Sequence, residues 1–190
     1  MILYLGLRPK SGTFHYPVIR TEFCGDLGEA LALWPKFTHI IFTSQTAVEY
    51  WPGPWDKEAI AIGEATAAAL RRHGVEPKMA PFATQEGVIE LIREMKGYFL
   101  IPRSRLARAA LTDFMQERQI PFHAVDLYDT HFQRLEPIPD LAEFDEIVFT
   151  SPSTVRGFLQ IYGTLPKGKK LTPIGPVTAS FLLNFNGCLV

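Results

Sequence analysis

One internal repeat constrains the fold of this chain more than any other feature. The segment IIFTSQTAV at 40–48 returns as IVFTSPSTV at 147–155. A second pair follows in the same order, with IGEAT at 62–66 and IGPVT at 174–178. Chance is a poor explanation for both matches. We therefore interpret them as two related units, each with a strand, a Thr-Ser turn and a helix, then a strand, a Gly-x-x-Thr turn and a helix.

Short apolar runs alternate with segments of helical period along the chain. Strands are predicted at 1–7, 39–43, 59–62, 98–101, 146–150, 171–174 and 188–190. Apolar residues at i, i+3, i+4 and i+7 predict helices over 88–95, 107–115 and 155–162. Strands that alternate with helices are typical of parallel sheets with crossover connections. The predicted fold class is therefore α/β, with two similar parallel-sheet lobes.

The strand count indicates where the lobes divide. Residues 38–128 contain enough predicted strands for a complete sheet, whereas 145–190 contain only three. We therefore expect the first strand to join the C-terminal segment, with one lobe inserted in the other and a cleft between them. The crossings are extended and can pair as a two-stranded connector. The predicted parts are lobe 1 (1–17 plus 133–190), lobe 2 (22–125) and the connector (16–23 and 124–132).

The composition argues against several classes of protein. The 190 residues carry 19 Lys and Arg against 20 Asp and Glu, a formal net charge of -1, which disfavours a nucleic-acid binder that relies on a basic field. The hydrophobic content of 47% suits buried cores, yet no apolar run reaches the roughly 20 residues of a membrane-spanning helix. Cys24 and Cys188 lack the spacing of a disulfide framework or zinc site. We expect a cytoplasmic protein.

The familiar catalytic motifs are missing from the sequence. It contains no G-x-S-x-G, no Walker G-x-x-x-x-G-K-[ST] and no G-x-G-x-x-G. The histidines show no metal-ligand spacing and are interpreted as structural: His15, His39, His73, His123 and His131. We therefore predict no metal site and none of the usual nucleotide or hydrolase sites.

Serine follows two of the predicted strands, where ligands bind in parallel sheets. Ser44 and Ser151 occupy predicted N-cap positions, and Pro152 suits the first helical position. Helix capping alone would explain these two serines.

Glycine and threonine follow the next strand of each copy. Gly63 and Gly175 precede the predicted helices, with Thr66 and Thr178 one turn in. For this pair we favour ligand binding, because a glycine exposes backbone N–H groups where a side-chain cap would be more ordinary.

Arginines follow the strand predicted at 98–101, at positions 103, 105 and 108. Cations beside a helix N-terminus are disfavoured by about 0.3–1 kcal/mol each, so an anionic ligand would explain at least one of them. For Arg105, simple pairing with Asp113 or Glu117 is the better interpretation. Arg8, at the end of the first predicted strand, is a similar candidate in the other lobe.

Tyr128 lies on the second predicted crossing between the lobes. There its phenol would either face the cleft or pack within the connector.

Together these residues resemble the uroporphyrinogen-III synthase family. The matching segments are LRP at 7–9, FTS at 42–44, IGxxT at 62–66, PR at 102–103 with Arg108, VDLYDT at 125–130, FTSPS at 149–153 and IGPVT at 174–178. Each is short, but their order over most of the chain makes the set specific. The family has two α/β domains, one inserted in the other. This chain is short for it, without room for a crossover helix between Leu7 and Pro17 or a final helix after Val190.

The resemblance implies a cofactor-free lyase of haem biosynthesis. It would cyclise hydroxymethylbilane to uroporphyrinogen III, inverting ring D through a spiro intermediate. Tyr128 would assist departure of the hydroxyl group as a hydrogen-bond donor. The residues expected to hold the carboxylates of the substrate are Arg8, Thr43, Ser44, Gly63, Thr66, Arg103, Arg108, Ser151, Ser153, Gly175 and Thr178. No nucleic acid, membrane or partner subunit is expected, so the protein would act as a monomer.

Two alternatives remain open at this point. An inactive two-lobed module would bind a tetrapyrrole or another polyanion without controlling the isomer formed. A phosphosugar-handling enzyme is the third possibility, since Ser and Thr at strand-helix turns also hold phosphate.

Overall fold

The computed structural model describes residues 1–186, so the strand predicted at 188–190 lies outside the described residues. Its contacts divide the chain into two compact units. Unit 1 comprises residues 1–21 and the segment from 130 onward, and unit 2 comprises residues 22–129. Each unit is built on its own sheet.

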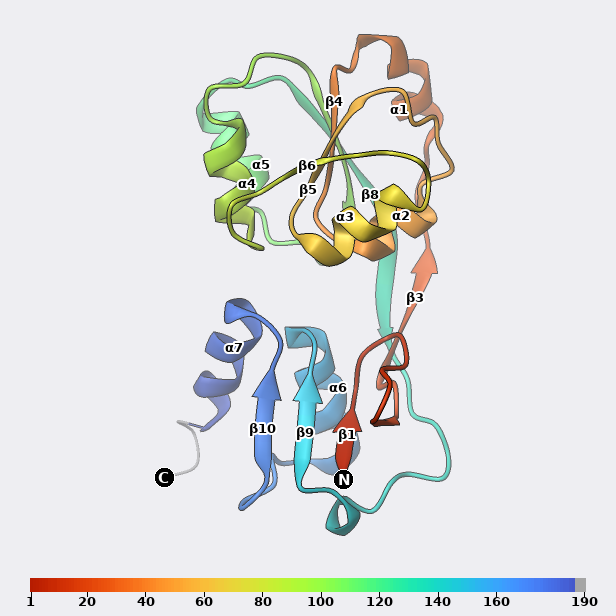
Figure 1. Ribbon diagram of the computed structural model, residues 1–190, viewed down its shortest axis with the longest axis vertical. Coiled ribbons are helices and arrows are strands. Elements are labelled where there is room, and N and C mark those ends of the chain that lie inside the picture. Colours follow the sequence, from red (N-terminus) through yellow and green to blue (C-terminus); the bar gives the residue numbers. More distant parts are fainter. Residues whose placement is uncertain (187–190) are drawn as a thin grey trace. The chain divides into compact units, whose positions relative to one another are not determined.

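Unit 2 carries a six-stranded sheet in the order β3-β8-β7-β4-β5-β6 (Figure 1). From β8 to β6 every pair of neighbours is parallel. The strands are β3 (Ile19–Phe23, which begins in unit 1), β4 (His39–Phe42), β5 (Glu58–Ala61), β6 (Lys78–Met79), β7 (Phe99–Ser104) and β8 (Phe122–Phe132). The helices are α1 (Gly28–Ala32), η1 (Trp34–Lys36), α2 (Gln45–Tyr50), α3 (Glu64–Arg71), α4 (Gln85–Ile92) and α5 (Ala110–Glu117).

Helices cover both faces of this sheet because its central strands are apolar on both sides. In β4, Ile40 and Phe42 belong to a core formed with α1, η1, α2 and α3. The intervening Ile41 belongs to a second core, formed with α4 and α5. All four residues of β4 are buried, as expected for a central parallel strand.

Unit 1 carries a four-stranded parallel sheet in the order β10-β9-β1-β2. Its elements are β1 (Ile2–Tyr4), β2 (Phe14–His15), η2 (Leu141–Glu143), β9 (Glu146–Phe149), α6 (Pro152–Tyr162), β10 (Lys170–Pro173) and α7 (Pro176–Asn186). Helices α6 and α7 share one hydrophobic core with β1 and β9, which includes Leu3, Phe149 and Phe158. The connection from β1 to β2 contains no helix.

The predicted α/β class with parallel sheets is confirmed, and each repeat copy forms the expected strand-helix units: β4-α2 and β5-α3, then β9-α6 and β10-α7. The prediction missed β2 and β6. Both strands are two residues long, and neither contains a buried residue, so neither produces an apolar run.

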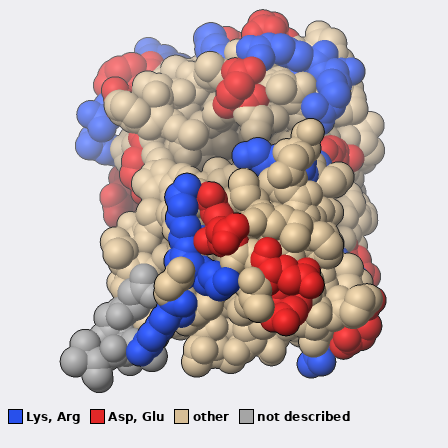
Figure 2. Space-filling view, turned by 60° about the horizontal axis from the view of Figure 1, so that its bottom comes forward, with Lys and Arg blue, Asp and Glu red and all other residues tan. Residues whose placement is uncertain are grey.

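Charged side chains of both signs are interspersed on the face shown in Figure 2. This mixture agrees with the net charge of -1. Within residues 1–186, no helix is long and apolar enough to span a membrane, and His, Cys, Asp and Glu form no group of three that could hold a metal.

Candidate functional site

Three neighbouring strands of unit 2 end at one edge of its sheet. Since β7, β4 and β5 are adjacent and parallel, their carboxyl ends lie together. Thr43 and Ser44 directly follow β4, Gly63 follows β5, and Arg103 lies at the end of β7. The structure thus brings these four candidates to the edge where parallel sheets bind ligands.

Ser44 caps helix α2, as its sequence position predicts. Its Oγ accepts a hydrogen bond from the Ala47 N–H at 3.0 Å. The same Oγ lies 3.0 Å from the phenolic oxygen of Tyr128, with which it is hydrogen-bonded. One hydroxyl therefore joins the start of α2 to the candidate catalytic phenol on β8.

The Tyr128 side chain is buried, with 7% of its surface exposed. Its ring stacks on that of Tyr50, the last residue of α2, with centroids 5.7 Å apart and an interplanar angle of 29°. Its backbone carbonyl accepts a hydrogen bond from the Arg105 N–H at 2.9 Å. Ring, hydroxyl and backbone are therefore all restrained.

In the Gly-x-x-Thr turn of unit 2, the glycine packs so closely against its surroundings that a larger side chain would clash. Gly63 has an extended backbone, but a Cβ added there would lie 2.9 Å from the Ala83 Cβ. Its carbonyl oxygen accepts hydrogen bonds from the N–H groups of Thr66 and Ala67. Thr66, on the first turn of α3, is only 3% exposed. Close packing therefore explains why position 63 is a glycine, in addition to any role in binding.

The arginines of the 101–108 segment are paired with carboxylates, but not with Asp113 or Glu117 as proposed for Arg105. Arg103 donates to Asp126 at 2.9 Å, across neighbouring residues of β7 and β8. The other pairs are Arg105 with Asp129 and Arg108 with Glu86. An incoming substrate carboxylate would have to share these cations with protein acids.

The segment that carries Arg108 is fixed by a buried amide. The Gln85 side chain donates to the Arg108 carbonyl oxygen at 3.0 Å and accepts from the Leu111 N–H at 3.2 Å. Hydrogen bonding to the Arg108 guanidinium is the main cause that lowers the pKa of Glu86 to about 2. Glu86 therefore stays ionised at neutral pH.

Unit 1 repeats the arrangement at the carboxyl ends of β10, β9 and β1, which are adjacent and parallel. Ser151 caps α6 in a reciprocal capping box with Thr154, and Pro152 occupies the start of the helix, both as predicted. Ser153 lies on the first turn of α6 and is partly exposed.

The second turn of this unit differs from its counterpart in unit 2. Gly175 has a φ of +82°, and a Cβ there would meet open space. Thr178, on the first turn of α7, is 2% exposed. Gly175 is therefore required by backbone conformation, whereas Gly63 is required by packing.

Arg8 follows β1 and is partly buried. Burial raises the pKa of Tyr4, and the charge of Arg8 partly opposes this rise. Arg8 therefore lies close enough to Tyr4 to act on its phenol electrostatically.

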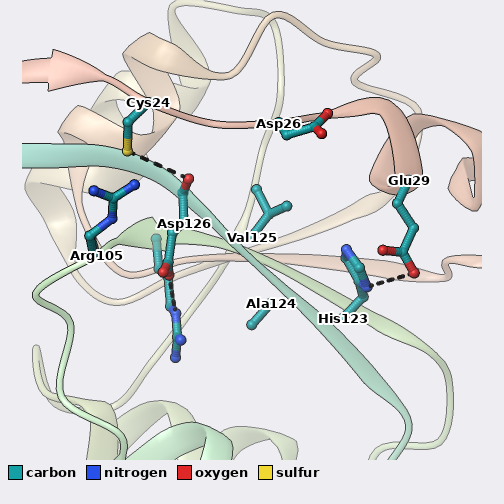
Figure 3. A pocket seen from close by; sticks show the side chains of 9 residues that line it. Cys24, Asp26, Glu29, Arg105, His123, Ala124, Val125 and Asp126 are labelled. Carbon is teal, nitrogen blue, oxygen red and sulfur yellow. Dashed lines mark hydrogen bonds and ion pairs between the residues drawn. The ribbon is translucent and has the colours of Figure 1, made fainter.

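A pocket of about 390 Å³ lies beside β8 in unit 2 (Figure 3). It is lined by Cys24, Asp26, Glu29, Arg103, Arg105, His123, Ala124, Val125 and Asp126. Its lining holds the acids Asp26, Glu29 and Asp126 and the basic residues Arg103, Arg105 and His123. An imidazole nitrogen of His123 lies 4.0 Å from a carboxylate oxygen of Glu29, and Arg103 is paired with Asp126. The balanced lining gives no net positive field for a polycarboxylate.

Sequence reasoning missed Tyr50 and the acidic partners of the arginines. Tyr50 is an aromatic residue at the end of a short helix, which carries no signal in a single sequence. Asp126 is different, because it lies within the VDLYDT segment that was already singled out. Its pairing with Arg103 follows once the register of β7 against β8 is known.

Three comparisons relate the chain to known proteins. The family model described as "Uroporphyrinogen-III synthase HemD" matches residues 12–188. A search of curated proteins gave no significant match. Among solved structures, uroporphyrinogen-III synthetase from Helicobacter pylori 26695 is 21% identical, with a TM-score of 0.68 over 96% of this chain and 87% of that one.

Structures from Thermus thermophilus are similar as well. A mutant uroporphyrinogen III synthase from this extremely thermophilic bacterium is 19% identical, with a TM-score of 0.65 over 97% of this chain and 88% of that one. Another T. thermophilus uroporphyrinogen III synthase structure is 20% identical, with a TM-score of 0.54 over 97% and 89%. At these identities the structural likeness shows the fold.

The family model shows the family as well as the fold, since it matches most of the chain. It confirms the resemblance that the ordered motifs indicated. The chain belongs to the uroporphyrinogen-III synthase family, an enzyme family of tetrapyrrole biosynthesis.

Proposed function

We propose that this chain cyclises hydroxymethylbilane to uroporphyrinogen III, as a cofactor-independent lyase of haem biosynthesis. The family match over residues 12–188 is the observation that carries the proposal. In this chemistry the terminal hydroxyl group leaves and the resulting azafulvene is attacked at the substituted carbon of ring D. The spiro intermediate then fragments and recloses with ring D inverted.

The two sheet edges supply the groups that hold the substrate. Its eight carboxylates match backbone N–H groups, hydroxyls and guanidinium groups at the strand ends. In unit 2 these come from Thr43, Ser44, Gly63, Thr66, Arg103 and Arg108. In unit 1 they come from Arg8, Ser151, Ser153, Gly175 and Thr178. We propose that each edge binds different carboxylates of one substrate molecule.

Tyr128 is the proposed catalytic residue. Its phenol would donate a hydrogen bond to the departing hydroxyl group, and the proton of that bond would leave with the oxygen. The contacts with Ser44 and Tyr50 support this role, because they hold the phenol in one orientation. A strong acid is not required, since the bilane loses hydroxide and cyclises spontaneously to the symmetric isomer. Much of the catalysis would come from the imposed conformation.

The proposal includes the organisation expected from the sequence. Lobe 1 (1–17 plus 133–190) and the inserted lobe 2 (22–125) would be joined by the connector (16–23 and 124–132). Since one substrate molecule would bind one chain, a cytoplasmic monomer would suffice.

A coupled assay tests the function directly. Hydroxymethylbilane is generated in situ by its synthase, this protein is added, and the oxidised type I and type III uroporphyrins are separated. Type III product is expected. Type I alone, from protein shown to be folded, would contradict the proposal and favour the binding module instead.

A further inference from the structure

Ser44 holds two groups with one oxygen atom. Its Oγ accepts the Ala47 N–H at 3.0 Å and lies 3.0 Å from the phenolic oxygen of Tyr128. A serine hydroxyl has one proton and two lone pairs. With one lone pair occupied by Ala47, Ser44 can still donate its proton or accept one more.

The phenol of Tyr128 has a single proton as well. If that proton is donated to a substrate hydroxyl group, the contact with Ser44 persists only with Ser44 as the donor. Rotation of the Ser44 hydroxyl hydrogen achieves this without moving either oxygen. With Ser44 as the donor to the phenolic oxygen, Tyr128 can point its own proton at the substrate.

We propose that Ser44 is a positioning residue for Tyr128 and that its hydroxyl group donates a hydrogen bond to the phenolic oxygen while Tyr128 acts on the substrate. This inference rests on the proposed function. For Ser44 alone, it replaces the carboxylate contact proposed above with a contact to the phenol.

The step balances in atoms and charge. The C–O bond of the hydroxymethyl group breaks, its electron pair leaves with the oxygen, and this oxygen takes the Tyr128 proton to depart as water. The pyrrole nitrogen lone pair stabilises the resulting cation, and Tyr128 is left as a phenolate. The proton lost when the ring D carbon rearomatises restores the phenol. Ser44 stabilises the phenolate through a charge-assisted hydrogen bond.

The surroundings favour this role for Ser44. Tyr128 is 7% exposed, and hydrogen bonds are electrostatically stronger away from water. Stacking on Tyr50 fixes the ring, and capping fixes the Ser44 Oγ. The bonds from Ala47 to Ser44 and from Ser44 to Tyr128 then point the same way and polarise one another.

The contact can be tested without turnover. Protein labelled with ¹³C at the tyrosine Cζ is titrated by NMR, and Tyr128→Phe identifies the Tyr128 signal among the six tyrosines. Ser44→Ala is expected to move the Tyr128 titration to higher pH by about one pH unit, because the phenolate loses a charge-assisted donor. An unchanged midpoint, or one shifted to lower pH, would overturn the inference.

Kinetics test whether the contact acts through Tyr128. Ser44→Ala and Ser44→Gly are expected to lower kcat about tenfold, with KM changed less than about twofold. Glycine is a tolerated N-cap, so Ser44→Gly separates the lost contact from a lost cap. Thr84→Ala removes the cap of α4 and serves as the matched control, with wild-type kcat.

A double variant separates positioning from independent binding. Ser44→Ala combined with Tyr128→Phe is expected to be no slower than Tyr128→Phe alone. If the Ser44 variants have a raised KM and an unchanged kcat, Ser44 binds a substrate carboxylate and the inference is wrong. If wild type forms type III and the Ser44 variants match it, this inference alone fails. If wild type forms only type I, the proposed function fails with it.

Discussion

The guanidinium group of Arg108 donates to both carboxylate oxygens of Glu86, at 2.9 and 3.2 Å. The contact joins the helix start at α4 to the segment before α5. Both side chains are substantially exposed, at 44% and 59%. Solvent screening therefore limits the stabilisation to about 1 kcal/mol or less, despite the large effect on the Glu86 pKa.

This pair predicts a pH-dependent effect of Glu86→Gln. The folded-state pKa of Glu86 is lowered from 4.5 to about 2, so its stabilisation is present above pH 4.5 and is lost as the pH falls towards 2. The variant should be less stable than wild type at pH 7 by up to about 1 kcal/mol. Urea unfolding at pH 7, 4 and 3 should show the difference shrinking. A pH-independent difference would contradict this explanation.

Tyr128→Phe should lower kcat by about tenfold to a hundredfold, because phenylalanine keeps the stacking on Tyr50 but has no proton to donate. Circular dichroism and thermal unfolding should show a folded protein. The coupled assay provides the rates. Wild-type turnover in the variant would remove Tyr128 from the site.

The two threonines provide a test in both units. Thr66→Val and Thr178→Val preserve shape at positions that are 3% and 2% exposed, and remove only the hydroxyl groups. Each should raise KM severalfold, because the variant loses the hydroxyl group that is proposed to bind a substrate carboxylate. Initial rates over a range of bilane concentrations measure the effect. If both variants keep wild-type kinetics, these threonines have no part in substrate binding.

The two turn glycines should respond to alanine for different reasons. Gly175→Ala places a side chain at a φ of +82° and should cost about 1–2 kcal/mol, with Gly175→Asn milder. Gly63→Ala has no such backbone strain but must displace Ala83, whose Cβ would be 2.9 Å away. Thermal unfolding of the three variants checks this. Equal tolerance of alanine and asparagine at 175 would argue against the conformational explanation.

Much of the fold could be predicted because central parallel strands are buried on both faces and produce continuous apolar runs. The internal repeat predicted the order of strands and helices in each copy. The caps at Ser44 and Ser151 could be predicted because serine is favoured at the N-cap of a helix. Strands β2 and β6 could not be found this way, since each is two residues long and partly or fully exposed.

The contacts of the candidate site were less accessible to sequence reasoning. Ser44 and Tyr128 are 84 residues apart, and their hydrogen bond depends on how α2 packs against β8. The partner of Arg103 depends on the β7–β8 register rather than on nearby sequence. Local sequence patterns therefore predicted the candidate site residues, whereas tertiary packing determined which of these residues contact one another.

The sheet of unit 1 has a consequence for synthesis on the ribosome. Strand β1 pairs with β9, so residues 2–4 find this neighbour only after residues 146–149 have been translated. Unit 2, at 22–129, is complete in the nascent chain before that point. Leu3 is fully buried in the folded protein, but it therefore lacks its β9 neighbour until all of unit 2 has been synthesised. The N-terminal strand therefore stays without its β9 neighbour during most of the synthesis of the chain.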